Sequence, residues 1–267
     1  MKKSLLVLLV ALMALTLIVG CKKEPKVSGW TVTFNTDGGS KVDSQIIEKG
    51  GGLAKKPDNP TKDGYYFVAW NTEDGEKFDF ATTITADITL KAVWKPVYTV
   101  GTLVESEGGW VFYDVDADNT EADPDGADNL SSSDCGWRYL VAAKSDISGY
   151  TWGDTGDSKA TGFAVGTGKD NTKAMIDNLS TSVAQQVWGK TIDGHSDWFI
   201  PSAGELQIMQ KVLYSNKKGT WASIYWSSTA SGTELELAYH LQFNASLGPV
   251  VTKRSQSGKS VRPVRAI

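Results

Sequence analysis

A strand-to-helix turn at residues 197–206 constrains the fold of this chain more than any other stretch. The apolar residues 198–200 predict a short strand that stops at Pro201, because proline cannot donate a ladder hydrogen bond. Ser202 and Glu205 then have the spacing of a capping box, in which each side chain satisfies a backbone N–H that the first helical turn leaves free. Apolar residues recur at helical spacing at Leu206, Ile208, Met209, Val212 and Leu213. We therefore expect this stretch to be scaffolding, although it gathers Asp, Ser and Glu near a His.

The N-terminus reads as a targeting segment. Lys2 and Lys3 precede the apolar run 5–19, which is too short to span a bilayer comfortably. The run ends in Ile18-Val19-Gly20-Cys21, which resembles the lipobox of bacterial lipoproteins. The resemblance implies that residues 1–20 are a lipoprotein signal peptide and that Cys21 carries the lipid. The alternative is an ordinary signal peptide with a chance cysteine.

The cysteine content and the net charge exclude several kinds of site and partner. The chain has 2 cysteines, so acylation of Cys21 would leave Cys135 without an intramolecular partner. A structural disulfide and a cysteine-only metal site are then excluded. The formal net charge of -4 comes with no basic stripe, so we expect no nucleic-acid partner.

Residues 21–29 form a short polar tether, and residues 30–96 have the pattern of a small β domain. Alternating apolar residues, Asp37-Gly38-Gly39 and Gly50-Gly51-Gly52 predict strands joined by turns. The segment resembles the internalin B-repeat, also called the Listeria–Bacteroides repeat. The matching residues are Thr33-Phe34-Asn35, Asp37-Gly38-Gly39, Pro60-Thr61-Lys62-Asp63-Gly64-Tyr65, Phe67-Val68-Ala69-Trp70, Phe78-Asp79-Phe80 and Asp87-Ile88-Thr89-Leu90 with Ala92 and Trp94. The resemblance implies a β-grasp-like module, in which we expect Trp70 and Trp94 to be core residues.

Residues 97–267 predict a larger domain with both strands and helices. Residues 110–113 and 137–143 predict two strands, and short strands are expected at 226–229, 238–243, 250–253 and 260–266. A helix capped by Thr172 is expected to present Met175, Ile176, Leu179, Val183 and Val187 on its apolar face.

This second domain resembles a family of secreted bacterial domains that includes the C-terminal domain of Legionella collagen-like proteins. The matching residues are Gly108-Gly109-Trp110-Val111-Phe112-Tyr113, Gly136-Trp137-Arg138-Tyr139-Leu140, Asp197-Trp198-Phe199-Ile200-Pro201-Ser202, Tyr225-Trp226-Ser227-Ser228-Thr229 and Val261-Arg262-Pro263-Val264-Arg265. The relatives of that family include the C-type-lectin and formylglycine-generating-enzyme folds. The resemblance implies an α+β domain with two helices and a mostly antiparallel sheet, and it implies no known reaction.

Catalytic patterns are weak. The only histidines are His195 and His240, and no G-x-S-x-G nucleophile elbow is present. His240 is expected on the exposed face of a strand. Formylglycine generation requires a pair of active-site cysteines in the related enzymes, and Cys135 stands alone after lipidation. We therefore expect no enzyme activity.

An acidic loop offers a calcium hypothesis. Its carboxylates at alternate positions could converge on one hard cation. The candidates are Asp114, Asp116, Asp118 and Asp125. The EF-hand pattern fails, because Asn119 replaces the turn glycine and Asp125 stands where a bidentate Glu belongs. A solvated acidic loop is the favoured interpretation, and no cofactor is expected.

The segment before the last strands holds the residues that we expect to face a ligand. In lectin-like folds this region tends to carry the binding face. The candidates are Trp221, Tyr225, Tyr239, His240, Gln242, Asn244, Lys253 and Arg254. The alternative is an ordinary polar sheet face. Arg262 and Arg265 are expected to be structural, stacking on an aromatic ring or pairing with Glu205.

The sequence as a whole favours a lipid-anchored bacterial protein of the outer membrane or cell surface. Its expected partners are the membrane, through Cys21, and an extracellular protein or glycan that it binds without catalysis. A structural component of the envelope or biofilm is the alternative, followed by an envelope enzyme.

Overall fold

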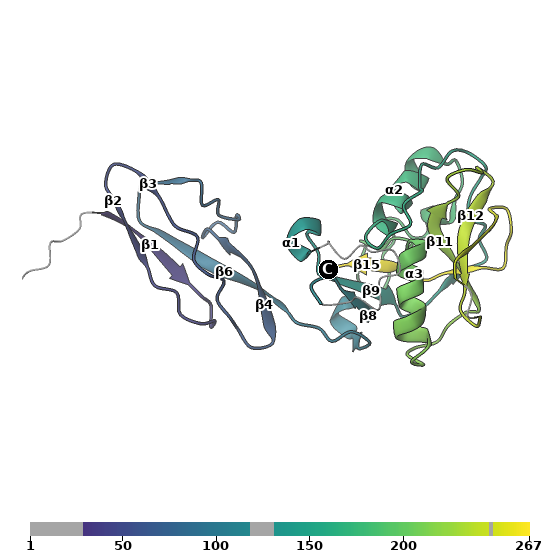
Figure 1. The fold of residues 1–267 in the computed structure, drawn as a ribbon, viewed down its shortest axis with the longest axis horizontal. Helices are drawn as coiled ribbons and strands as arrows, with labels where there is room; N and C mark the ends of the chain where they lie inside the picture. Colours follow the sequence, from purple (N-terminus) through teal and green to yellow (C-terminus); the bar gives the residue numbers. More distant parts are fainter. Residues whose placement is uncertain (1–28, 118–130, 246–247) are drawn as a thin grey trace, which may run out of the picture. The chain divides into compact units, whose positions relative to one another are not determined.

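A computed structural model describes residues 29–117, 131–245 and 248–267 (Figure 1). The chain divides into two compact units between Val97 and Tyr98. The described part of the first unit consists of strands and loops, and the second unit combines sheet with few helices, as the sequence predicts. No helix within the described ranges has both the length and the apolar character needed to cross a bilayer.

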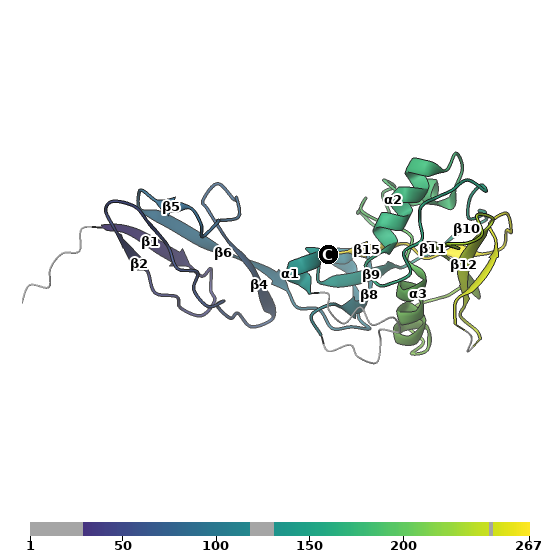
Figure 2. The same ribbon diagram turned by 45° about the horizontal axis from the view of Figure 1, so that its top comes forward.

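The N-terminal unit is a four-stranded sheet with the order β2-β1-β6-β4 (Figures 1 and 2). Its strands are β1 (Gly29–Asn35), β2 (Gln45–Glu48), β4 (Tyr65–Asn71) and β6 (Ile88–Pro96), and β3 (Gly52–Leu53) pairs with β5 (Thr83–Ile84) beside them. The central pair β1 and β6 is parallel, and the outer pairs are antiparallel.

One face of this sheet forms the core of the unit. Alternation along β1 and β6 buries Val32, Phe34 and Leu90. Trp70 is 2% exposed and meets the edge of the Phe34 ring, with 4.9 Å between ring centroids. Trp94 is partly buried against the same cluster, and its indole N–H donates to the Thr36 carbonyl at 2.9 Å. Both tryptophans are therefore core residues, as expected.

The C-terminal unit contains two sheets (Figures 1 and 2). The five-stranded sheet has the order β10 (Ile147–Ser148), β14 (Ser260–Val261), β11 (Ile224–Ala230), β12 (Leu237–Gln242) and β13 (Val250–Lys253). The four-stranded sheet has the order β15 (Val264–Ala266), β9 (Tyr139–Ala143), β8 (Gly109–Asp114) and β7 (Leu103–Val104). All pairs are antiparallel except β11 with β14.

Short helices fill the space around these sheets. The helical elements are η1 (Glu105–Glu107), α1 (Ser132–Cys135), α2 (Gly168–Asn178), η2 (Val183–Gln186), α3 (Ala203–Met209) and the π-helical turn η3 (Gln210–Tyr214) that continues α3. Helix α3 contacts β8 of one sheet and β11 of the other, and α2 contacts β11. The apolar residues of α3 belong to one buried cluster of this unit, and those of α2 belong to a second.

Two expected local structures are wrong. Residues 198–200 form no strand: Phe199 makes a single bridge to Val264. Thr172 does not cap a helix but lies inside α2, where its hydroxyl donates to the Gly168 carbonyl at 2.8 Å and accepts from the Ile200 N–H at 2.9 Å. The helix ends at Asn178 because Leu179 is extended, so Val183 belongs to the separate turn η2.

The capping box is confirmed, and it reaches further than the sequence indicates. The Glu205 N–H donates to Ser202 Oγ at 3.1 Å, and Glu205 Oε2 accepts from the Ser202 N–H at 2.8 Å. Glu205 Oε1 also accepts from the N–H groups of Gly166 at 2.9 Å and Gly168 at 3.4 Å. This fully buried carboxylate therefore ties the start of α2 to the start of α3.

The two C-terminal arginines are structural, but neither pairs with Glu205. Arg262 is 1% exposed, donates to Asp146 Oδ1 at 2.5 Å and stacks on Trp221 at 4.0 Å. Arg265 forms a two-point ion pair with Asp197, at 2.9 and 3.1 Å, and a further one with Glu107 at 3.0 Å. Each arginine thus holds a terminal strand against a loop that is distant in the sequence.

Replacement of Gly168 by Ala should destabilise the C-terminal unit. A Cβ there would clash with the Glu205 carboxylate and lie 2.8 Å from the Ser202 nitrogen. The expected loss is roughly 1–3 kcal/mol from overpacking, against roughly 0.4–1 kcal/mol that a strain-free Gly→Ala change would contribute. Gly232→Ala is the control, since nothing lies within 4 Å of its Cβ. Urea unfolding of both variants measures the difference in the free energy of unfolding. Equal values would show that the packing around the Glu205 carboxyl group tolerates the extra carbon.

The Glu205 carboxyl should make stability depend on pH. Burial raises its pKa to about 7, against the opposing effect of the N–H donors of Ser202, Gly166 and Gly168. The native state therefore holds a proton that the unfolded state has lost, so this stabilisation is complete below pH 4.5 and disappears as pH rises through 7. Over that window the wild type should lose roughly 3 kcal/mol more than Glu205→Gln. Urea unfolding followed by tryptophan fluorescence tests this, and parallel pH curves would refute it.

Candidate ligand-binding site

Two of the expected ligand-facing residues are buried, so the expectation of exposure is wrong for them. Arg254 is 1% exposed, because its guanidinium stacks on Trp152 at 4.3 Å and donates to the carbonyls of Gly156 at 2.7 Å and Leu237 at 3.3 Å. Tyr225 is fully buried, and its hydroxyl donates to Asp146 at 2.8 Å. Burial raises the pKa of Tyr225, and the Asp146 charge adds to the effect. Both side chains are part of the core.

The other candidates do not form one surface. Asn244 and Lys253 are exposed, and Trp221 is half-buried with its ring stacked on the buried Arg262 guanidinium. Tyr239 meets the Phe163 ring edge-on at 5.3 Å. Alternation along β12 places His240 and Gln242 on the face opposite to Tyr239. The fold therefore does not bring these aromatic residues together around one pocket. The four residues are Trp221, Tyr225, Tyr239 and His240.

His240 instead joins a small group of nitrogen atoms with its cross-strand neighbour. It pairs with Trp226, and their rings are 6.0 Å apart at 79°. The imidazole is half-buried rather than exposed, because it packs against this indole. His240 Nδ1 and Trp226 Nε1 are both buried, and neither has a hydrogen-bond partner in the described part of the chain.

Lys259 completes the group. Its ammonium lies 4.3 Å from the centroid of the Trp226 ring, the side chain is 7% exposed, and Nζ donates to Gln256 Oε1 at 2.9 Å. Burial lowers the pKa of Lys259, and burial together with the Lys259 charge lowers the pKa of His240. We refer to Trp226, His240 and Lys259 as the Lys259 cluster.

Sequence reasoning missed Lys259. Its only signal is its position after Gly258, which has φ +85° and turns the chain into β14. A lysine in a polar turn is typical of solvent-exposed sites. Its burial follows from the packing of that turn over Trp226, which no local pattern indicates.

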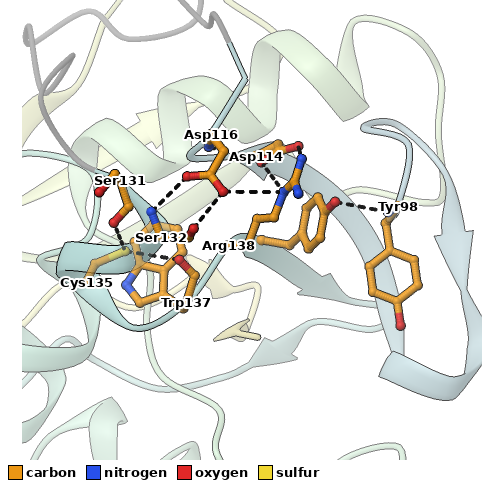
Figure 3. A network of polar contacts seen from close by, with 9 residues as sticks. Tyr98, Asp114, Asp116, Ser131, Ser132, Cys135, Trp137 and Arg138 are labelled. Atoms are coloured by element: carbon orange, nitrogen blue, oxygen red, sulfur yellow. Dashed lines mark hydrogen bonds and ion pairs between the residues drawn. The ribbon is translucent and has the colours of Figure 1, made fainter. Parts of the chain in front are cut away.

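The described calcium candidates are engaged in protein contacts (Figure 3). Asp114 forms a two-point ion pair with Arg138, at 3.0 and 3.1 Å. Asp116 accepts from the N–H and hydroxyl of Ser132, at 2.8 and 2.6 Å, and lies 3.7 Å from the Arg138 guanidinium. Asp118 and Asp125 lie outside the described residues. Within the described ranges no three His, Cys, Asp or Glu side chains gather in a metal-binding arrangement.

The nucleophile and base candidates are not paired either. The Cys135 thiol lies 3.1 Å from the carbonyl oxygens of both Ser131 and Trp137 (Figure 3). His195 Nε2 lies 2.9 Å from the Ser106 carbonyl, in a loop contact. Cys21, the expected lipidation site, lies outside the described residues.

Comparison with known proteins identifies the N-terminal unit. Residues 30–93 match the family of the Listeria-Bacteroides repeat domain. Two similar proteins of Evansella cellulosilytica are named "Putative membrane protein", 39% identical over 97 residues, and "Putative Gly-rich membrane protein", 35% identical over 97 residues. Each alignment covers 35% of this chain and only 14% and 11% of the respective relative. The N-terminal unit therefore contains a Listeria-Bacteroides repeat domain, as its sequence resemblance predicts.

Proposed function

We propose that this chain is a lipid-anchored bacterial surface protein whose C-terminal unit binds an extracellular ligand without catalysis. The repeat domain at residues 30–93 and the membrane-protein names of the two relatives support an envelope location. The lipobox-like sequence before Cys21 supports a lipid anchor, and the outer membrane is the proposed destination. The repeat domain would then lie between the anchor and the binding unit.

The proposed fold of the C-terminal unit is lectin-like. Helices α2 and α3 with two mostly antiparallel sheets support this proposal, together with the resemblance to the Legionella collagen-like C-terminal domain. Folds of this kind host many functions, so the fold alone does not specify a function, and particular residues have to indicate it.

The Lys259 cluster is the observation that best supports a ligand-binding role. Polar groups in protein interiors are almost always hydrogen-bonded, and exceptions call for an explanation. Here two buried nitrogen atoms face no protein partner among the described residues, and they flank a buried ammonium. A ligand group that accepts hydrogen bonds at this place would satisfy the indole N–H and the ammonium. Catalysis has less support, because His195, His240 and Cys135 each make separate local contacts.

The purified chain should retain ligands on arrays of glycans and extracellular proteins. Lys259→Met should weaken the retained signals, since it removes the charge of the cluster while keeping an apolar stem against Trp226. Lys190→Met is the matched control, because that lysine is exposed and belongs neither to the Lys259 cluster nor to the expected ligand surface. If folded wild-type protein retained no ligand on either array, this result would contradict a binding role and favour a purely structural one.

Replacement of Cys21 by Ala should abolish lipid labelling. Cells expressing the wild type should incorporate radiolabelled palmitate into this protein and retain it in the membrane fraction, because several acyl chains anchor a protein firmly. The Cys21→Ala variant should appear without label, with Cys135→Ala as the control that stays labelled. Equal labelling of wild type and Cys21→Ala would remove the anchor from the proposal.

A further inference from the structure

Lys259 stands apart from the other buried cations of the C-terminal unit. Arg262 and Arg265 are each paired with carboxylates, and Arg254 donates to several backbone carbonyls. Lys259, although 7% exposed, has a single neutral acceptor, Gln256 Oε1, and the face of an indole ring. That acceptor is shared, since Gln256 Oε1 also accepts from the Thr252 hydroxyl at 2.7 Å.

These contacts do not compensate for burying the charge. A buried ammonium needs a counter-charge and hydrogen bonds to all its donors to offset the loss of hydration. The indole face and one shared amide oxygen leave donor capacity on Nζ unused, since an ammonium has three N–H groups. Among the described residues, Lys259 forms no ion pair with a carboxylate. An anionic group is therefore the chemical complement of this ammonium.

The neighbouring groups fit the same kind of ligand. Trp226 Nε1 can only donate a hydrogen bond, and a neutral imidazole donates from one of its two nitrogens. Both Trp226 Nε1 and His240 Nδ1 are buried without a partner in the part of the chain that the structure describes. Cross-strand pairing also places Val250, 43% exposed, beside His240 on the same face. The cluster therefore combines a cation and hydrogen-bonding nitrogens with an exposed apolar edge.

We propose that the Lys259 cluster binds the carboxylate of a small ligand, with a sugar acid such as a uronic acid as the ligand class. The carboxylate would accept from the Lys259 ammonium and the Trp226 indole N–H, and the apolar face of the sugar ring would lie against Val250. This assignment rests on the proposed ligand-binding function, which by itself specifies no ligand chemistry.

Glucuronate is the probe, and neutral glucose is its control. In spectra of the ¹⁵N-labelled chain, the indole N–H resonance that disappears in Trp226→Phe should shift on titration with glucuronate and not with glucose. Lys259→Met should weaken the response roughly tenfold or more, because it removes a charge-assisted hydrogen bond. Lys190→Met, at an exposed lysine outside the cluster, should leave it unchanged. No shift with glucuronate, or an equal shift with glucose, would overturn the assignment.

The stability of the ligand-free chain provides a second readout. If Lys259 serves a ligand, Lys259→Met relieves an uncompensated charge and should melt at the wild-type temperature or above it. A purely structural lysine would give the opposite result, so a lower melting temperature, or failure to fold, would count against the site. Lys259→Arg keeps the charge and should retain the glucuronate response.

These measurements separate the site from the broader function. If glucuronate shifts the Trp226 indole resonance but no ligand is retained on the arrays, the carboxylate site is supported and the adhesive role is contradicted. Retention on arrays without any glucuronate shift would overturn the site and leave the binding function standing elsewhere on the unit.

Discussion

The Glu205 carboxylate is the constraint on which the C-terminal unit depends. It closes the capping box of α3 with Ser202 and also accepts from the N–H groups that open α2. The oxygen atoms of this one side chain accept from backbone N–H groups at the start of both helices, which would otherwise be buried without partners. Gly168 has no side chain where the carboxylate passes. Glu205 therefore holds the starts of the two helices together, alongside the hydrogen bond between Thr172 and the Ile200 N–H.

Basic side chains on aromatic rings consolidate the rest of the unit. Arg262 on Trp221 and Arg254 on Trp152 connect the last strands to loops far away in the sequence, and each guanidinium also donates to backbone carbonyls. Lys259 on Trp226 has the same geometry without the same compensation. The contrast among chemically similar pairs distinguishes a candidate site from scaffolding.

Predictions from local pattern succeeded where the signal and the structure are both local. The capping box of Ser202 and Glu205 follows from a three-residue spacing, and the strands of the repeat domain follow from alternation and glycine-rich turns. Thr172 fails because its hydroxyl finds a partner in the distant Ile200 N–H and so sits within a helix rather than at its start. The expected ligand surface fails for a related reason: Arg254 and Tyr225 look polar in sequence but meet partners contributed by other elements.

The sequence by itself determined the division into a repeat domain and a larger domain rich in sheet, the capping box that starts the helix at Ala203, and the structural role of the terminal arginines. Only the tertiary structure decided which polar groups of the described residues have partners. Hydrogen-bond and ion-pair partners such as Asp146 and Arg262 are separated by more than a hundred residues, and no periodicity encodes such a pairing. For the same reason the sequence around Lys259 indicates only a polar turn. The burial of its charge without a carboxylate partner results from the packing of that turn over Trp226.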